Sequence, residues 1–172
     1  MAAHYIYLIS SLPMLYFGVK PEITSQKFLD ACLSLIPEDE FETLKSIIEN
    51  SKPANSSDFF KQWFKFETEL KNELVRHRAD RQKKDAGKYL RENEYWSSSI
   101  IHSAMSAYKS PSIIEAEKLL DMERWRFLDE LCAGHYFDFE VLLIYAIKIR
   151  ILERWGKINT ANKEKLLEEA LN

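Results

Sequence analysis

Apolar side chains recur along most of the chain at intervals of three and four residues, which is the spacing of one face of an α-helix. Helix-capping and turn-forming residues divide this pattern, and predict helices that begin near residues 24–25, 37–38, 57 and 110–111, with a possible break near residues 93–97. Residues 4–9 alternate too weakly to distinguish a strand from a helix, and residues 51–57 form the clearest loop. The predicted fold class is all-α: an irregular multi-helix bundle with one long helix and a central buried helix near the C-terminus.

That central helix is predicted from the segment YFDFEVLLIYAIKIRILERW, residues 136–155. At about 100° per residue its apolar side chains lie on both sides of the helix, a pattern typical of a helix packed between others. Its six charged residues are too many for a helix surrounded by lipid. We expect Glu140, Arg150 and Arg154, together with Glu67 of an earlier helix, to form structural ion pairs. Gly156 is expected to end the helix, and a short acidic helix to follow.

Composition agrees with a folded helical protein. Of the 172 residues, 46% are apolar and 13% aromatic, which excludes a disordered chain. Four glycines and five prolines are too few for a turn-rich β sandwich or barrel. We predict a single helical domain over residues 1–172, and two lobes divided within residues 50–57 are the alternative.

The sequence shows no pattern of an export signal or a membrane span. Cys32 and Cys132 lie in apolar helical context, where small core residues are more typical than a disulfide. Residues 1–17 lack a basic start and are interrupted by polar residues and Pro13, so they do not resemble a signal peptide. No window offers roughly eighteen uncharged apolar residues, and no transmembrane helix is expected.

The predicted long helix changes chemistry along one face. Its apolar stripe comprises Phe59, Trp63, Phe66, Leu70 and Leu74. The same spacing then continues as His77, Arg81, Lys84 and Lys88, within a run of seven Lys and Arg against two Asp over residues 76–91. This stripe is either a solvated face or a surface that binds an acidic partner. Nucleic acid is a weaker interpretation, because Tyr89 is the only aromatic residue of the run and no nucleic-acid-binding motif is present.

Catalytic patterns are not found. The four histidines, His4, His77, His102 and His135, form no HExxH motif, and Cys132 with His135 lacks a second metal-binding pair. There is no glycine-rich phosphate loop and no nucleophile elbow. The carboxylate pairs Glu67–Glu69 and Asp138–Glu140 are of a kind common on helices. We therefore predict no catalytic residue, no metal site and no cofactor, and a chain that is not an enzyme by itself.

Two segments resemble each other. WFKFE at residues 63–67 and YFDFE at residues 136–140 share an aromatic-Phe-x-Phe-Glu pattern, and apolar residues follow each Glu after three and seven positions. An internal duplication of about seventy residues is one interpretation. Chance similarity between two amphipathic helices is the other, and the sequence does not separate them.

Three stretches resemble an uncharacterised bacterial family whose genes lie among those for the components of V-type (V/A-type) ATPases. They are HYIYLISSLPML at 4–15, FFKQWFKFETELKNELVRHRADR at 59–81 and HYFDFEVLLIYAIKIRILERW at 135–155. That family in turn looks like a reduced counterpart of the ATPase's C-type subunit, the helical collar between the central rotor stalk and the membrane proteolipid ring. The C-type collar protein is roughly twice as long, so this chain would supply part of a collar.

The resemblance implies a non-catalytic subunit of a bacterial V-type ATPase or ATP synthase, an ion-transporting complex. Its expected partners are the rotor stalk and the proteolipid ring, and it would be cytoplasmic and peripherally membrane-associated through the complex. The alternative is a free-standing helical module that binds an acidic protein or nucleic acid through residues 76–91.

Overall fold

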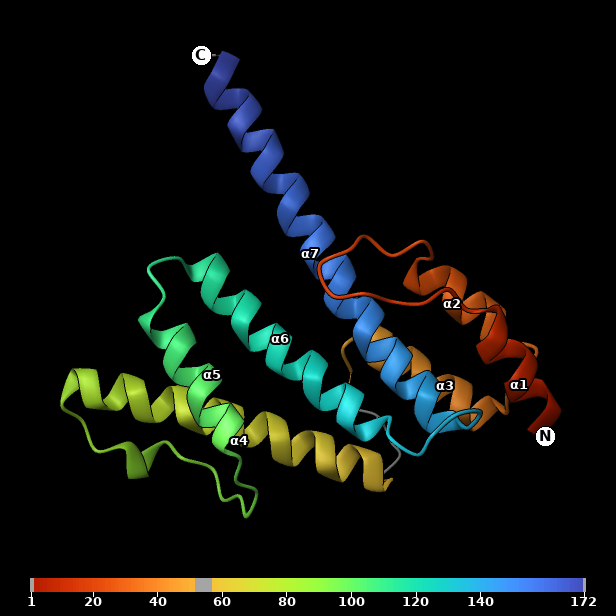
Figure 1. The fold of residues 1–172 in the computed structure, drawn as a ribbon, viewed down its shortest axis with the longest axis horizontal. Coiled ribbons are helices and arrows are strands. Elements are labelled where there is room, and N and C mark those ends of the chain that lie inside the picture. The colour runs from red at the N-terminus through yellow and green to blue at the C-terminus, as the bar shows by residue number, and fades with distance from the viewer. Residues whose placement is uncertain (1, 52–56, 172) are drawn as a thin grey trace. The chain divides into compact units, whose positions relative to one another are not determined.

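The computed structural model describes residues 2–51 and 57–171, of which 2–3 and 162–171 are described by their backbone alone. All regular structure in these ranges is helical (Figure 1): α1 (Ala2–Ser11), α2 (Ser25–Cys32), α3 (Glu38–Ile48), α4 (Asp58–Gln82), a short 3-10 turn (Ala86–Lys88), α5 (Ser98–Lys109), α6 (Ile113–Leu131) and α7 (Phe139–Leu171). The all-α prediction is confirmed. The predicted long helix is α4, with 25 residues, and α7 is longer still, with 33. The loop predicted at 51–57 falls mainly on residues outside the described ranges.

Several helices begin where the sequence predicted and for the predicted reason. The Thr24 side chain accepts a hydrogen bond from the backbone N–H of Lys27 at 3.3 Å and so caps α2. Pro37 precedes α3, whose first turn carries three acidic residues that favour the positive end of the helix dipole. Ser112 accepts from the N–H of Glu115 at 3.4 Å at the start of α6. Residues 4–9, which the sequence left undecided, lie within α1.

The chain divides into two compact units. Unit 1 comprises residues 1–54 and 128–172, and unit 2 comprises residues 55–127. One division lies within the range 50–57 that the sequence offered as a break. The other lies inside α6, where the sequence carries no linker, so unit 1 is discontinuous in sequence.

The core of unit 1 is built around α7. This helix contacts α1, α2 and α3, and its Leu142, Leu143 and Ile149 are fully buried. Tyr145 packs on Phe28 of α2 with ring centroids 5.0 Å apart, and its hydroxyl donates to the backbone oxygen of Pro13 at 2.9 Å. The buried central helix predicted near the C-terminus is thereby confirmed.

The predicted end of that helix is corrected. Residues 139–171 are helical without interruption, so Gly156 lies inside α7 and no separate acidic helix follows. Its backbone does not adopt the left-handed conformation that a helix-ending glycine provides, in contrast to Gly134, whose φ is +92° in the turn between α6 and α7.

The core of unit 2 is aromatic. Phe66 of α4 and Phe127 of α6 stack nearly parallel, with centroids 4.1 Å apart, and Trp63 stacks on Phe66 at 5.6 Å. Leu70 of α4 and Ile100 of α5 are fully buried. The apolar stripe predicted for the long helix is therefore the face by which α4 contributes to this core.

The segment that follows α4 is held along the same helix by two asparagines. Asn72 makes a two-way bond with the backbone of Arg91, donating to its oxygen at 2.9 Å and accepting from its N–H at 3.0 Å. Asn93 donates to the backbone oxygen of Lys65 at 2.9 Å. This segment therefore has defined hydrogen bonds to α4 although it contains little regular structure.

None of the described helices combines the length and the apolar character needed to cross a membrane.

Candidate partner-binding surface

The face expected to run from His77 to Lys88 along one helix is interrupted, because α4 ends at Gln82. Lys83 adopts the left-handed conformation with φ 53°. The N–H groups of Lys83 and Lys84 then bond back to the carbonyl oxygens of Asp80 and Ala79 at 3.0 and 2.9 Å, which closes the last turn of the helix. Lys84 and Lys88 follow the helix and are not on its continued face, so that part of the prediction is corrected.

His77 differs from the exposed cations because its side chain is packed against a neighbouring helix. Its ring stacks on Tyr108 of α5 with centroids 5.4 Å apart. The side chain is half-buried, and its Nε2 atom is enclosed without a hydrogen-bond partner among the described residues. His77 therefore contributes to the packing of α4 against α5 rather than to an open surface.

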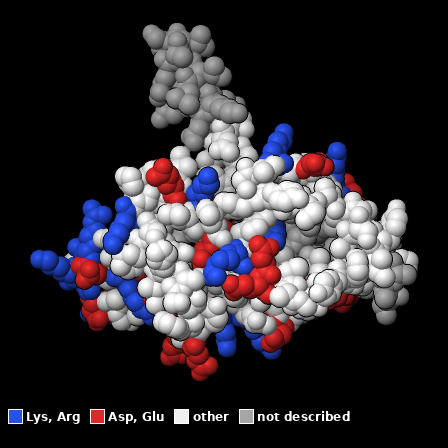
Figure 2. All heavy atoms as spheres, in the orientation of Figure 1, with Lys and Arg blue, Asp and Glu red and all other residues white. Residues whose placement is uncertain are grey.

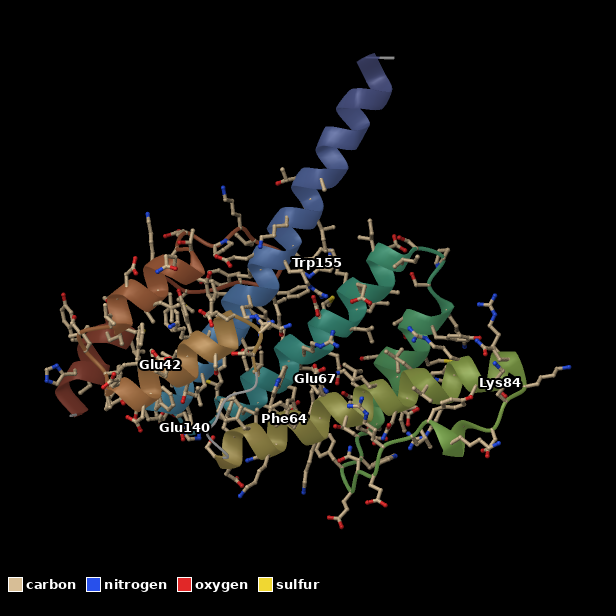
Figure 3. All side chains as sticks on the ribbon, turned by 180° about the vertical axis from the view of Figure 1, so that it is seen from behind. Glu42, Phe64, Glu67, Lys84, Glu140 and Trp155 are labelled. Atoms are coloured by element: carbon tan, nitrogen blue, oxygen red, sulfur yellow. The ribbon has the colours of Figure 1, made fainter. Side chains whose placement is uncertain are left out.

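Arg81, Lys84 and Lys88 do lie together in a stretch of exposed positive charge, which we call the basic segment, residues 78–91. Its six exposed cations are Arg78, Arg81, Lys83, Lys84, Lys88 and Arg91. Only Asp80 and Asp85 oppose them, so the segment carries a formal charge of +4 in a chain whose net charge is −3. Figure 2 shows Lys and Arg gathered at the end of unit 2 where α4 ends, and Figure 3 shows Lys84 pointing outward there. This distribution is complementary to an acidic surface.

The four residues expected in structural ion pairs have different surroundings. Glu67 accepts from Arg124 Nε at 2.6 Å and lies 3.3 Å from Lys71 Nζ. Arg150 is half-buried and donates to the side-chain oxygen of Asn50 at 2.7 Å, and no described carboxylate lies within ion-pair distance of it. The guanidinium of Arg154 lies 5.9 Å from the ring centre of Trp155.

Glu140 also differs from the expectation. It occupies the first turn of α7 at the base of that helix (Figure 3), and no described cation lies within ion-pair distance of it. The negative charge of Glu140 instead acts electrostatically on Tyr5 of α1 and Glu40 of α3. These two residues are hydrogen-bonded to each other. Burial raises the pKa of Glu40, and the carboxylates of Asp39 and Glu140 act in the same direction, whereas the Tyr5 hydrogen bond lowers it.

Other polar residues attach α7 to its neighbours in unit 1. Glu153 accepts from the backbone N–H and the hydroxyl of Ser25, at 2.7 and 2.9 Å, at the start of α2. Lys148 forms an ion pair with Asp129 near the end of α6. The sequence could not assign these roles, because the partners lie 128 and 19 positions apart along the chain.

Glu67, expected in an ion pair, belongs to a charge network in unit 2 whose other members were not predicted. Arg124 donates to Glu67 and, at 2.9 Å, to Asp121, whose side chain is only 1% exposed. Burial alone would lower the pKa of Arg124, but the two carboxylates raise it above its usual range. The network joins α4 to α6 within unit 2.

Glu123, the residue before Arg124, is buried and accepts several hydrogen bonds. It accepts from Ser103 Oγ at 2.9 Å, from Arg126 at 2.7 Å and from Ser99. Burial tends to raise the pKa of Glu123, but these hydrogen bonds outweigh burial and hold the pKa below its ordinary value of 4.5. The charged form therefore stabilises the folded state.

We predict that Glu123→Gln destabilises the protein at pH 7 and that the difference from wild type shrinks in acid. A depressed folded-state pKa contributes stability above the unfolded-state pKa, and this contribution is lost as the pH falls through the folded-state pKa. Denaturant unfolding of both proteins between pH 7 and pH 3 measures the difference, with exposed Glu94→Gln as control. A difference that is constant across this range would contradict the assignment.

A shallow hollow of about 470 Å³ lies beside α4, lined by Lys61, Phe64, Lys65, Thr68, Glu92, Asn93 and Glu94. Phe64 is half-exposed in it (Figure 3), and the surrounding charges are of both signs. An apolar side chain within a polar rim is the arrangement of a protein contact more than of a catalytic site.

Residues 40–172 match the family described as "Protein of unknown function (DUF2764)", which is well over half of the chain. The chain belongs to this family. The DUF2764 match begins in α3 and includes the basic segment, the buried network of unit 2 and all of α7. No curated protein and no solved structure matched the chain.

Proposed function

We propose that this DUF2764 chain is a non-catalytic connector in a bacterial V-type ATPase or ATP synthase, between the central rotor stalk and the proteolipid ring. Three segments of the sequence resemble a family encoded among the genes of that complex, and they coincide with α1, α4 and α7. An all-helical chain is the kind of structure that the resemblance implies. The DUF2764 match itself carries no link to the ATPase, so the link depends on those three segments.

The basic segment is the observation that favours a partner-binding role. Two of its six exposed cations lie in the last turns of α4 and four follow that helix, and Asn72 fixes the backbone of Arg91 at the far end. A positive surface of defined shape gives electrostatic complementarity, which accelerates and orients the association of proteins. We propose that it docks on an acidic surface of the rotor stalk or the ring, on the cytoplasmic side of the membrane.

The association test reverses two charges of this surface. Arg81→Glu with Lys84→Glu should slow association with an ATPase preparation depleted of this protein, by about tenfold or more at low salt. The loss should diminish at high salt, where the Debye length is only a few Å. Lys20→Glu with Lys27→Glu, an equal charge change at exposed positions of unit 1, is the matched control. Equal association rates for the two double variants would show that the basic segment is a solvated surface and does not bind the partner.

Membership in the complex is tested independently of the docking surface. The protein should be present in an otherwise complete ATPase complex purified from native membranes. The purified chain should bind no ATP at micromolar concentrations. Absence from the complex would refute the connector role whatever the association rates are.

The alternative function is a free-standing helical module that binds an acidic protein or nucleic acid. The same basic segment supports it, and Tyr89 is 60% exposed there. A nucleic-acid role predicts affinity for oligonucleotides that falls steeply with salt as counterions are released. Binding to components of the ATPase without affinity for oligonucleotides would favour the connector.

A further inference from the structure

We propose a divalent transition-metal site at the turn between α6 and α7, formed by His135, Asp138 and Glu140. One donor atom from each of these three side chains lies within 4.8 Å of the other two. All three residues are half-buried. The sequence had predicted no metal site, because its histidines form no motif that pairs them with cysteines or with further histidines.

Backbone structure brings the three donors together. Gly134, in the left-handed conformation with φ +92°, turns the chain after α6, and the N–H of His135 bonds to the carbonyl oxygen of Cys132 at 3.0 Å. Asp138 directly precedes α7, and Glu140 lies in its first turn. Three positions within six residues thus converge on one side of the turn.

The oxygens of Asp138 have separate roles. Oδ1 accepts from the N–H of Val141 at 3.4 Å and caps α7, whereas Oδ2 lies 2.6 Å from Nδ1 of His135. Donor atoms bound to a common zinc ion lie about 3 Å or slightly more apart, because each is about 2.0–2.2 Å from the metal. Oδ2 and Nδ1 therefore need only small shifts to share an ion, and the cap is kept.

The charge balance around the turn also favours a cation. Besides Asp138 and Glu140, the neighbouring α3 contributes Asp39 and Glu40, and Glu140 lies close enough to Glu40 to affect it. The charge of Lys148 acts on Cys132, and this lysine forms an ion pair with Asp129. Glu140 itself has no described cation within ion-pair distance. A bound divalent ion would supply the missing positive charge.

The donor set indicates the kind of metal. One imidazole nitrogen and two carboxylate oxygens suit Zn²⁺, Mn²⁺, Fe²⁺ or Co²⁺, whereas Mg²⁺ and Ca²⁺ prefer sites of oxygen alone. Three protein ligands leave at least one coordination position for water or for a group of a partner. This site is independent of the proposed connector role, since it lies in unit 1 and the basic segment lies in unit 2.

The experiment titrates the chelator-treated full chain with ZnCl₂, MnCl₂ and MgCl₂ in a calorimeter. We expect one Zn²⁺ or Mn²⁺ per chain, and binding of Mg²⁺ at least about tenfold weaker. Glu140→Gln and His135→Ala should each weaken Zn²⁺ binding by about a hundredfold or more, since loss of even an indirect supporting group costs about 10–100-fold. His102→Ala, at an exposed histidine of α5, is the matched control and should bind as wild type does.

A second measurement locates the ion without any substitution. Mn²⁺ should broaden the imidazole NMR signals of His135 at substoichiometric amounts, before those of the other three histidines. This readout keeps the site testable if His135→Ala does not fold. Binding that both site variants leave unchanged, broadening that does not favour His135, or no saturable binding of Zn²⁺ or Mn²⁺ would overturn the proposal.

Discussion

Arg124→Ala should lower the free energy of unfolding by about 3–5 kcal/mol, the loss typical when one member of a buried charge network is removed. The substitution takes the guanidinium away from Asp121, whose side chain is 1% exposed, and from Glu67, whose side chain is 14% exposed. Both carboxylates would remain within the protein with less compensation for their lost hydration. Urea unfolding followed by circular dichroism measures the change from the shift of the midpoint.

Lys71→Ala is the matched control for this prediction. Lys71 also pairs with Glu67, at 3.3 Å, but its side chain is 58% exposed, so its loss should cost no more than about 1 kcal/mol. A double variant, Arg124→Met with Glu67→Gln, should be less destabilised than Arg124→Ala, because it removes a carboxylate together with its partner. Similar values for Arg124→Ala and Lys71→Ala would show that the network is solvated in the folded protein.

Local signals in the sequence predicted most helix positions correctly. The Thr24 cap, Pro37 with the acidic turn after it, and the apolar spacing of residues 136–155 each depend on neighbours within a few positions. Such features are decided by local stereochemistry and by burial of one face, which a single sequence records. The all-α fold class follows from them.

Features that depend on distant partners were not predictable. The side chain of Asn72 acts nineteen positions away, on Arg91, and Arg124 finds Glu67 fifty-seven positions away. In a single sequence, a charged helix residue that is buried cannot be distinguished from one that is solvated. Only the tertiary packing shows which of the two it is.

The suspected internal repeat illustrates the same limit. WFKFE lies within α4, whereas the first three residues of YFDFE precede α7, so the aligned stretches differ in secondary structure at their start. The side chains that follow are nevertheless similar in burial, since Leu70 and Leu143 are both fully buried. Duplication and chance similarity both remain consistent with these positions.

Gly156→Pro should destabilise the protein by about 3 kcal/mol or more and reduce its helix content. Inside a helix, proline removes the hydrogen bond of its own nitrogen and clashes with the preceding turn. Residues on both sides of Gly156 are helical, and its carbonyl oxygen accepts from the hydroxyl of Thr160 at 2.9 Å. Far-UV circular dichroism and urea unfolding measure the two effects. Unchanged helix content would mean that α7 ends near Trp155, as the sequence alone suggested.

The matched pair Gly156→Ala and Gly134→Ala also tests whether α7 continues through residue 156. The result is read from the sign of each change in the free energy of unfolding. A Cβ at either glycine meets no atom within 4 Å, so space does not distinguish the two positions. Backbone conformation does: alanine favours the helical backbone at 156 and should stabilise by about 0.5–1 kcal/mol. At 134, where φ is +92°, alanine is strained and should destabilise by about 1 kcal/mol or more. If Gly156 instead ended the helix in a left-handed conformation, both substitutions would be destabilising. Opposite signs are therefore expected only for a helix that continues through residue 156.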